Sequence, residues 1–429
     1  MAAVPQAAEL EAMLQTAVSH HRAGRLSEAQ RLYRDILQVL PDHPVVNNSL
    51  GIALKGQGKT EEAEAVFSRL ATVAPDYAPA HSNLGNILFE QHKLQQAEAC
   101  YRRALAVNPN MVDALKNLGL VIVDSGRFEE SFPWFRRHAE LAYGKPDSAG
   151  QMPPHKTKHD QEQRDYLAQV SAQVSAQVSA QVSAQVSAQV AGGAAPTFRL
   201  EEGGRVPGRA VNPDTSQGEI AQRWRTSAPQ IAVIDNLLTD QGLEQLRNYC
   251  WRSTMWNKSY PNGYLGAMPE HGFACPLVAQ IANELRSTYP AIIGGHPLLQ
   301  WWGFKYDSQL KGINVHADFA AVNVNFWITP DEANLDPEGG GLVIWDKPAP
   351  LEWTFAQYNN PNAGKNIRDF LAQSGARSVT VPHRTNRAVI FDSDLFHETD
   401  RITFKEGYLN RRINITMLFG LREAAAKRT

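Results

Sequence analysis

The chain has 429 residues, of which 43% are hydrophobic and 20% charged, so it can bury ordinary globular cores and is long enough for two or three domains. The formal net charge of −2 argues against a dedicated nucleic-acid-binding protein. The three cysteines are too few for a disulfide framework, and no apolar run approaches the roughly 20 residues that span a bilayer. Because residues Met1 to Met13 do not look like a secretory signal, we expect a cytoplasmic protein that does not bind membranes.

The N-terminal third repeats itself every 34 residues, which predicts four helix pairs from about residue 8 to residue 143. Small residues let the two helices of a pair approach closely, and an aromatic residue fills the gap between them. Proline begins the connection to the next pair. The recurring positions are Pro41, Pro75 and Pro109; Gly24, Gly58, His92 and Gly126; Ala29, Ala63, Ala97 and Ser131; Tyr33, Phe67, Tyr101 and Phe135; and Gly51, Gly85 and Gly119.

This spacing resembles the tetratricopeptide repeat family, which implies an all-α solenoid of about four repeats over residues 1–143, with a concave groove that binds a protein or peptide. Asn83 and Asn117 stand directly before the Leu-Gly of their repeats. In superhelical members of the family, asparagine at this place pairs with the backbone of a bound peptide, so the resemblance implies a peptide-binding role for both residues. The alternative is that the two amides cap or bridge neighbouring helices.

Residues 144–195 have a different composition, first rich in Pro, Lys, His and Gln and then built from a Ser-Ala-Gln-Val tetrad, iterated from about Ala168 to Val190. Ala and Gln favour a helix over a strand in these tetrads. Uncharged low-complexity sequence of this kind is typical of a spacer, so we expect a linker that carries no chemistry.

Residues 196–429 contain eight short stretches rich in β-branched and aromatic residues, which predict a sandwich or jelly roll. Helices are predicted before them over Thr239–Cys250, with Thr239 as the cap, and over Pro276–Thr288. The stretch Tyr260–Phe273 fits either a mobile lid or a plain surface loop. The predicted strands are Leu299–Tyr306, Ile313–His316, Val322–Ile328, Leu342–Trp345, Ser378–Val381, Ala388–Phe391, Leu395–Glu398 and Ile413–Phe419.

Two histidines and an aspartate lie among these predicted strands. Residues two apart on a strand point to the same side, so His316 and Asp318 can converge on a point that His397 reaches from another strand. Two imidazoles and one carboxylate suit non-haem Fe(II), with positions left open for reactants. The alternative for the first two residues is a core histidine and a turn-capping aspartate. His383 follows a proline before a predicted turn, and we interpret it as a solvated loop residue rather than a ligand.

The last predicted strand has one polar face. Alternation places Arg412 and Asn414 on that face and Ile413 and Ile415 on the other. A guanidinium inside a barrel needs an anion, because a buried unpaired charge is costly, and a carboxylate is the simplest partner. Arg411 competes for this role, but its parity is that of the apolar face, so we favour Arg412.

Together these features resemble the Fe(II)- and 2-oxoglutarate-dependent oxygenases, whose fold is the double-stranded β-helix, a cupin-like jelly roll with flanking helices. The resemblance is strongest over about residues 296–420 and is closest to prolyl-hydroxylase-like members. It implies that His316, Asp318 and His397 are the catalytic ligands of Fe(II). The residues that it assigns to the cosubstrate 2-oxoglutarate are Arg412, Asn414, Tyr306 and Asn325, with Asn323 and Trp327 on the same strand face as Asn325 where those members often carry Thr and Tyr.

The resemblance implies a dioxygenase, or hydroxylase, that uses 2-oxoglutarate and O2 to hydroxylate an unactivated C–H bond. A repeat array fused to such a domain implies a protein or peptide substrate recruited through the repeat groove, with proline as the first guess for the modified side chain. One alternative is a small-molecule oxygenase whose repeats serve only for assembly with partners. The other is a non-catalytic binding scaffold.

Overall fold

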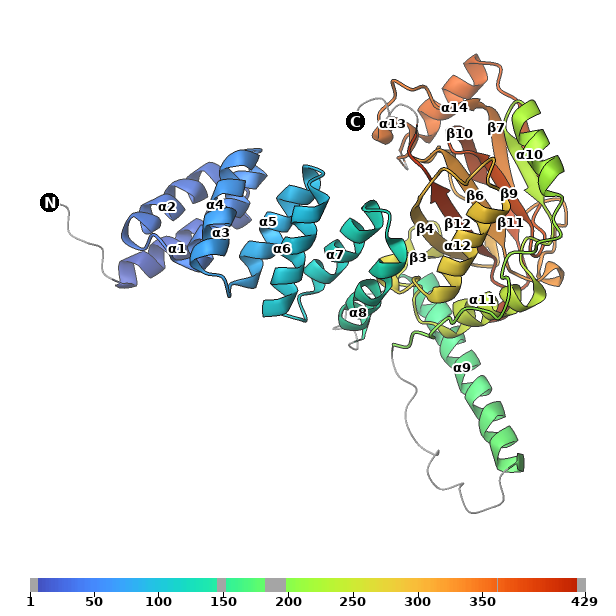
Figure 1. Ribbon diagram of the computed structural model, residues 1–429, viewed down its shortest axis with the longest axis horizontal. Coiled ribbons are helices and arrows are strands. Elements are labelled where there is room, and N and C mark those ends of the chain that lie inside the picture. The colour runs from blue at the N-terminus through green and yellow to red at the C-terminus, as the bar shows by residue number, and fades with distance from the viewer. Residues whose placement is uncertain (1–6, 145–151, 182–197, 361, 423–429) are drawn as a thin grey trace. The chain divides into compact units, whose positions relative to one another are not determined.

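The computed structural model describes residues 7–144, 152–181, 198–360 and 362–422 (Figure 1). The chain divides into two compact units, Met1–Trp134 and Phe135–Thr429, which we call the repeat unit and the C-terminal unit. This division falls inside a helix, before the boundary expected at residue 143. No helix in the described parts of the chain has the length and apolar character needed to cross a membrane.

The repeat unit is a row of antiparallel helix pairs (Figure 1). Close approach within a pair depends on glycine: a Cβ at Gly51 would stand 2.5 Å from the Phe67 ring, and one at Gly85 would stand 2.8 Å from the Tyr101 ring. The expected helical repeats are therefore present, with glycine and the aromatic residue in direct contact. The helices are α1 (Ala7–Arg22), α2 (Leu26–Val39), α3 (Pro44–Gly56), α4 (Thr60–Val73), α5 (Ala78–Glu90), α6 (Leu94–Val107), α7 (Val112–Asp124), η1 (Phe128–Ser131) and α8 (Phe132–Tyr143).

A second glycine series serves the turns rather than the packing. Gly24, Gly58 and Gly126 have φ angles of 74°, 76° and 78°, and nothing lies within 4 Å of a Cβ built on any of them. Glycine adopts this left-handed conformation without the strain that a Cβ brings. His92 occupies the same place in its repeat with a φ of 56°, so one turn of the array carries that strain.

The C-terminal unit is built on antiparallel sheets. Its described residues form a seven-stranded sheet in the order β1-β9-β6-β12-β4-β3-β2, a three-stranded sheet β10-β7-β8 and a two-stranded sheet β11-β5. The two larger sheets share one apolar core, because Trp327 and Phe391 of the first pack with Ile344 and Leu395 of the second. The strands are β1 (Ile231–Ile234), β2 (Lys258–Tyr260), β3 (Tyr264–Ala267), β4 (Leu298–Tyr306), β5 (Gln309–Leu310), β6 (Val322–Trp327), β7 (Leu342–Pro348), β8 (Ser378–Val381), β9 (Ala388–Asp392), β10 (Leu395–Thr399), β11 (Ile402–Thr403) and β12 (Ile413–Phe419).

Seven of the eight predicted strands form within a few residues of their predicted bounds. The prediction of a strand over Ile313–His316 was wrong, because only His316 makes a bridge, to His397. The face assignment in the last strand is right: Asn414 lies opposite Trp327, and this cross-strand pair faces the interior between the sheets.

The stretch Tyr260–Phe273 is neither a lid nor a surface loop. It forms the β2-β3 hairpin, which pairs with β4 and continues the seven-stranded sheet. Aromatic stacking supports this arrangement, since the Tyr260 and Tyr264 rings lie 4.4 Å apart and the Tyr264 and Tyr306 rings 5.3 Å apart. Because the stacking partner Tyr306 is distant in sequence, the local composition indicated only a loop.

The predicted helices are α11 (Asp240–Arg252) and α12 (Pro276–Thr288). Thr239 caps α11 as expected, accepting a hydrogen bond from the Gly242 amide at 3.1 Å. Arg247 Nε donates to the carbonyl of Ile328 at 2.5 Å, which holds α11 against the end of β6, and Figure 1 shows α12 passing in front of this sheet. The other helical segments of this unit are α9 (Pro154–Gln181), α10 (Gln217–Thr226), η2 (Pro269–His271), η3 (Asp331–Ala333), α13 (Phe355–Tyr358), α14 (Gly364–Gln373) and η4 (Tyr408–Asn410).

Helix α9 corrects the expectation that residues 144–195 are a spacer. Its first half is packed into the C-terminal unit, with Lys156, His159 and Gln163 buried. Gln163 Nε2 donates to the carbonyls of Trp251 and Ser253, at 3.2 Å and 2.9 Å. Polar composition suggested solvation here, whereas these polar groups satisfy buried carbonyls. The tetrads are helical up to residue 181, as favoured, and those in 182–190 lie outside the described residues.

Candidate metal centre

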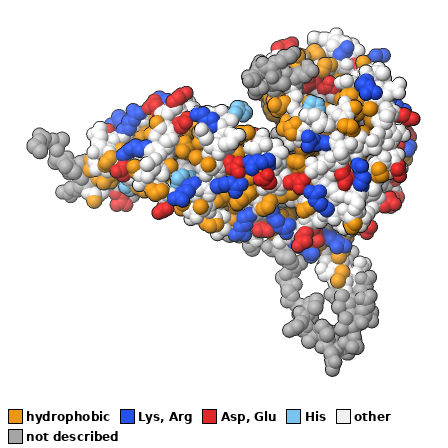
Figure 2. All heavy atoms as spheres, viewed as in Figure 1, with side chains coloured by type: hydrophobic (Ala, Val, Ile, Leu, Met, Phe, Trp, Pro, Cys, Tyr) orange, Lys and Arg blue, Asp and Glu red, His pale blue; other side chains and the backbone are white. Residues whose placement is uncertain are grey.

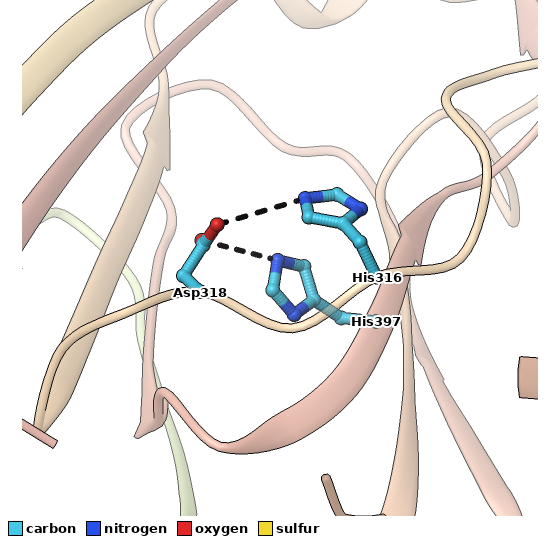
Figure 3. A group of neighbouring side chains, drawn as sticks. All are labelled: His316, Asp318 and His397. Atoms are coloured by element: carbon cyan, nitrogen blue, oxygen red, sulfur yellow. Dashed lines mark ion pairs between the residues drawn. The ribbon is translucent and has the colours of Figure 1, made fainter. Parts of the chain in front are cut away.

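The structure brings His316, Asp318 and His397 together at one point (Figure 3). The Nε2 atom of His316 lies 3.8 Å from Asp318 Oδ1, and the Nε2 atom of His397 lies 3.4 Å from Asp318 Oδ2. One imidazole nitrogen from each histidine and one carboxylate oxygen of Asp318 all lie within 4.8 Å of one another. Two nitrogens and one oxygen at this spacing can surround a single metal ion.

Backbone pairing holds the two histidines side by side. The His316 amide donates to the His397 carbonyl at 2.9 Å, and the His397 amide donates to the His316 carbonyl at 2.8 Å. The Asp318 amide donates to the Ser393 carbonyl at 3.1 Å. Although Ile313–His316 is not a strand, these hydrogen bonds fix His316 against His397 in β10 and Asp318 against the turn before β10.

The hydrogen bonds of the imidazoles leave the correct nitrogens free. His316 Nδ1 lies 2.8 Å from the Asn314 carbonyl, and His397 Nδ1 lies 3.0 Å from the Leu395 carbonyl. A carbonyl can only accept, so each Nδ1 carries the proton and each Nε2 presents a lone pair to the centre. Burial lowers the pKa of His316, and the neighbouring His397 lowers it further, which favours the neutral form that binds metals.

A chain of amides holds the Asp318 carboxylate from the side of the sheet. Asn323 Nδ2 donates to Asp318 Oδ2 at 2.7 Å, and Asn325 Nδ2 donates to Asn323 Oδ1. Asn325 Oδ1 in turn accepts from Asn414 Nδ2 and from Thr416 Oγ1, each at 2.8 Å. Every donor points toward the carboxylate, so this chain orients Asp318 and stabilises its charge. The amides of Asn325 and Asn414, which the resemblance assigned to the cosubstrate, are thus engaged in the chain that holds the candidate ligand Asp318.

Asn359 supports the second oxygen of Asp318, donating to Oδ1 at 3.2 Å. Burial raises the pKa of Asp318, but the adjacent imidazoles of His397 and His316 and the Asn359 amide outweigh this effect, and the net pKa lies below its ordinary value. The group is therefore a carboxylate at neutral pH. Sequence reasoning missed Asn359, because it follows the short helix α13 and belongs to no motif.

Arg412 is fully buried, two residues before the Asn414 member of the amide chain. Its Nε donates to the Gly340 carbonyl at 2.5 Å and its Nη2 to the Gly341 carbonyl at 3.3 Å, while Nη1 has no hydrogen-bond partner among the described residues. Its Cζ lies 4.8 Å from the ring of Tyr306, which places that predicted residue directly against the guanidinium. Burial lowers the pKa of Arg412, which reflects a charge without a counterion. The donor set fits an incoming carboxylate.

The competing arginine has partners of its own. Arg411 Nε lies 2.7 Å from Glu162 Oε2 in α9, and its Nη1 lies 3.5 Å from Asp307 Oδ1. In the described residues no such ion pair is formed by Arg412. The choice of Arg412 from strand parity is therefore consistent with the structure, and the neighbour's charge is neutralised within the protein.

The interpretation of His383 as a solvated loop residue was wrong. Its side chain is buried, with its ring 5.8 Å from that of Trp327 and 5.1 Å from that of Phe404. The turn after β8 folds inward because the His383 amide donates to the Gly339 carbonyl at 3.2 Å. Burial, followed by the charges of Arg412 and Arg387, lowers the pKa of His383 to about 3, so the ring is neutral. The sequence holds no local signal for this burial.

A cavity of about 900 Å³ opens beside the triad and is lined by His316 and Asp318. Aromatic rings and asparagine amides form most of the remaining wall, whose described residues include no Lys, Arg or Glu. A second cavity of about 940 Å³ shares Asn262, Ile313 and Asn314 with the first and is lined beyond them by charged residues. The two cavities therefore adjoin within the C-terminal unit and form a hollow surface, with the triad at the first of them.

The predicted peptide-binding asparagines of the repeat unit are paired with other asparagines. Asn83 Nδ2 donates to Asn48 Oδ1 and Asn117 Nδ2 to Asn86 Oδ1, both at 2.8 Å. The two amides thus bridge neighbouring helices, which is the alternative weighed for them. A role in peptide binding stays a prediction.

Charges of both signs are mixed on the face of the molecule shown in Figure 2. Lys and Arg side chains alternate there with Asp and Glu, and no large area of one sign stands out. This face offers no basic stripe of the kind that binds a phosphate backbone.

Comparisons with known proteins match the N-terminal region. Two models of the tetratricopeptide repeat family match residues 20–87 and residues 78–111. No curated protein matches the chain.

Solved structures of repeat proteins overlap part of the chain. A crystal structure of the MamA protein is 21% identical, over 32% of this chain and 74% of its own, with a TM-score of 0.29. MamA from Desulfovibrio magneticus RS-1, from residue 41 to its end, is 19% identical, over 32% of this chain and 78% of its own, with a TM-score of 0.30. The first such repeat domain of Spaghetti (RPAP3), bound to the HSP90 peptide SRMEEVD, is 22% identical over 27% of this chain and 92% of its own, with a TM-score of 0.26. From the helix pairs, their period and the family match, the N-terminal region of this chain consists of tetratricopeptide repeats.

Proposed function

We propose that the C-terminal unit is an Fe(II)- and 2-oxoglutarate-dependent oxygenase with a double-stranded β-helix fold, and that it hydroxylates a C–H bond of a protein or peptide side chain. One observation carries this proposal. Two imidazoles and a carboxylate converge within 4.8 Å, and a fully buried arginine, two residues before the Asn414 member of the amide chain behind that carboxylate, has no carboxylate partner among the described residues. The first group suits Fe(II), and the second suits the far end of a 2-oxo dicarboxylate.

The fold supports this assignment. A seven-stranded and a three-stranded antiparallel sheet share one core, and the triad joins the beginning of β10 to the segment before β6. Two facing antiparallel sheets with ligands on their inner sides are what a double-stranded β-helix requires.

In the proposed reaction, 2-oxoglutarate, O2 and R–H are converted to succinate, CO2 and R–OH. Bound Fe(II) supplies the activation of O2. The chain holds that ion through His316, Asp318 and His397 and fixes the cosubstrate's far carboxylate through Arg412. The amide chain that ends on Asp318 keeps this ligand in one orientation, and the aromatic walls of the cavity exclude water from the reacting bond.

The hollow surface supports a polypeptide substrate. Among the described residues its inner cavity is uncharged apart from Asp318, and aromatic rings and amides of this kind can hold an apolar side chain together with the backbone groups on either side of it. The second cavity extends the surface away from the triad, which a long substrate would occupy. Proline remains the first guess for the modified residue, and the repeats would raise the local concentration of the substrate by binding another part of it.

The decisive experiment uses the full chain without oxygen. Adding Fe(II) and then 2-oxoglutarate should produce a weak visible absorption band in the wild type, which His316→Ala should lack. His296→Ala, which changes a histidine of the same unit outside the triad, should keep it. Absence of the band in the wild type would contradict the proposal and leave the non-catalytic scaffold.

A second experiment separates the two kinds of oxygenase. With oxygen admitted, the wild type should form succinate, and proteins captured on the full chain should gain the mass of one oxygen atom. Succinate formation without any modified protein would contradict the polypeptide substrate and favour a small-molecule oxygenase with the repeats as an assembly module.

A further inference from the structure

We propose that His383 and Trp327 complete the anion site headed by Arg412, so that three side chains donate hydrogen bonds to the far carboxylate of the cosubstrate. The inference rests on the proposed function and deepens it, because it assigns a binding role to two residues outside the ligand set. Neither residue has a task in the metal centre itself.

The side chains of Arg412, Trp327 and His383 are buried, and each has a polar atom without a hydrogen-bond partner among the described residues. Arg412 and Trp327 are 0% exposed and His383 is 2% exposed. In the described residues, Arg412 Nη1, Trp327 Nε1 and both ring nitrogens of His383 lack a hydrogen-bond partner. A buried donor without a partner is costly, so several in one place indicate that an acceptor binds there.

The three side chains also lie close to one another. Arg412 Cζ lies 5.6 Å from the Trp327 ring, whose centre lies 5.8 Å from that of His383. Both Arg412 and His383 are tied to one short run of backbone, since the guanidinium donates to the carbonyls of Gly340 and Gly341 and the His383 amide donates to the preceding carbonyl.

Glycine makes this close assembly possible. A Cβ at Gly341 would stand 1.8 Å from the Val381 carbonyl oxygen and 2.9 Å from the His383 amide nitrogen. Gly340 has a φ of 75°, a conformation that side chains disfavour. Glycine at these positions therefore allows both Arg412 and His383 to pack against the same turn.

Among the described residues, no carboxylate forms an ion pair with Arg412. Asp331 Oδ1 lies 3.9 Å from His383 Nδ1, but its side chain is 61% exposed and accepts a hydrogen bond from the Thr385 amide at 2.6 Å. Asp400 acts on Arg412 through space without forming an ion pair. Among the described residues no carboxylate is therefore paired with the Arg412 charge.

A carboxylate matches this set of donors. Its two oxygens lie in one plane and accept several hydrogen bonds, which suits the free edge of a guanidinium, an indole N–H and an imidazole N–H. Because the His383 ring is neutral at physiological pH, it contributes a hydrogen bond rather than a second charge. One arginine charge then neutralises one carboxylate.

The test is a titration of the Fe(II)-loaded full chain with 2-oxoglutarate in the absence of oxygen, followed by visible absorption. We expect His383→Phe and Trp327→Phe each to weaken 2-oxoglutarate binding by about 10-fold or more, the size of a hydrogen bond to a charged group. His383→Asn, which keeps a donor, should recover part of the affinity. The monocarboxylate 2-oxopentanoate, which has a methyl group in place of the far carboxylate, should bind equally to the wild type and to all three variants.

Stability gives a second readout that a structural role would not produce. Because His383→Phe removes two unpaired buried polar atoms, the unliganded variant should be at least as stable as the wild type, and Trp327→Phe should lose only the packing of the larger ring. Trp301→Phe is the matched control: its Nε1 donates to the Phe273 carbonyl at 2.6 Å, so its loss should lower stability and leave the 2-oxoglutarate titration unchanged.

Two outcomes would overturn the inference while leaving the proposed function intact. In the first, the wild type binds 2-oxoglutarate and the Phe variants bind it equally well. In the second, the variants lose 2-oxoglutarate and 2-oxopentanoate to the same extent, which would place the effect at the metal. A wild type that binds Fe(II) but shows no response to 2-oxoglutarate would instead overturn the proposed function. If His383→Phe does not fold, Trp327→Phe and His383→Asn carry the same test.

Discussion

The two units of the chain treat their buried polar groups differently. In the repeat unit the asparagines satisfy one another across neighbouring helices, and Gln91 Oε1 is the one buried side-chain polar atom of its described residues that lacks a partner. In the described residues of the C-terminal unit such atoms lie on many side chains, and four of them belong to Arg412, Trp327 and His383 around a single turn.

This difference fits a repeat array in the first unit and the proposed ligand site in the second. A repeat array gains its stability from contacts between neighbouring repeats, so every polar group can find a partner nearby. A ligand site must keep donors and acceptors free for the ligand, and the surrounding fold has to compensate for their cost. Substitutions in either unit can therefore test whether the two units differ in this way.

The largest effect is expected in the packing of the repeat unit. Tyr101 is fully buried, contacts Gly85 and donates to Asn86 Oδ1 at 2.8 Å, so Tyr101→Ala should lower the free energy of unfolding of this unit by about 3–5 kcal/mol. Urea unfolding would measure the loss. The Fe(II) and 2-oxoglutarate absorption of the same variant should be unchanged, and its disappearance would contradict the independence of the two units.

A smaller loss is expected where α9 joins the C-terminal unit. Glu162→Gln removes the charge that pairs with the buried Arg411 and should cost about 1.5–3 kcal/mol in urea unfolding. The matched control is Glu62→Gln in the repeat unit, whose pair with Arg34 is exposed and should contribute less than about 0.5 kcal/mol. Equal effects of the two changes would mean that α9 is attached no more firmly than a surface pair.

The amide chain behind Asp318 should affect metal binding more than stability. Asn323→Ala removes the donor to Asp318 Oδ2 and should weaken Fe(II) binding by about 10- to 100-fold, as measured by anaerobic titration. Asn86→Ala, which removes an asparagine bridge of the repeat unit, should leave Fe(II) binding unchanged. Unaltered binding in Asn323→Ala would show that the carboxylate needs no support from the sheet.

The smallest effect is a gain. His92 has a φ of 56° where the corresponding turns carry glycine, so His92→Gly should raise the stability of the repeat unit by about 1 kcal/mol. Gly58→Ala, the reverse change at the equivalent turn, should lower it by a similar amount. Thermal unfolding of both variants would check the sign, and a loss in His92→Gly would mean that the imidazole makes a compensating contact.

Sequence patterns predicted the elements of the C-terminal unit well but not all of its site. Alternation in the last strand placed Arg412 and Asn414 on the inner face, and the His-x-Asp spacing identified two members of the triad. The same reasoning missed Asn359 and misread His383, because an isolated residue in a loop carries no periodicity that reports its burial. It also misread the first half of α9, where polar side chains contact buried carbonyls instead of water.

The amino-acid sequence by itself determined the repeats and the identity of the candidate ligands, since a period of 34 residues and a strand alternation are properties of the local chain. Only the tertiary structure decided which buried groups keep a partner. Arg411 and Arg412 are adjacent in sequence, yet the first meets Glu162 from α9 and the second meets glycine carbonyls and no carboxylate among the described residues. That outcome depends on contacts between segments far apart along the chain, and no local pattern encodes them.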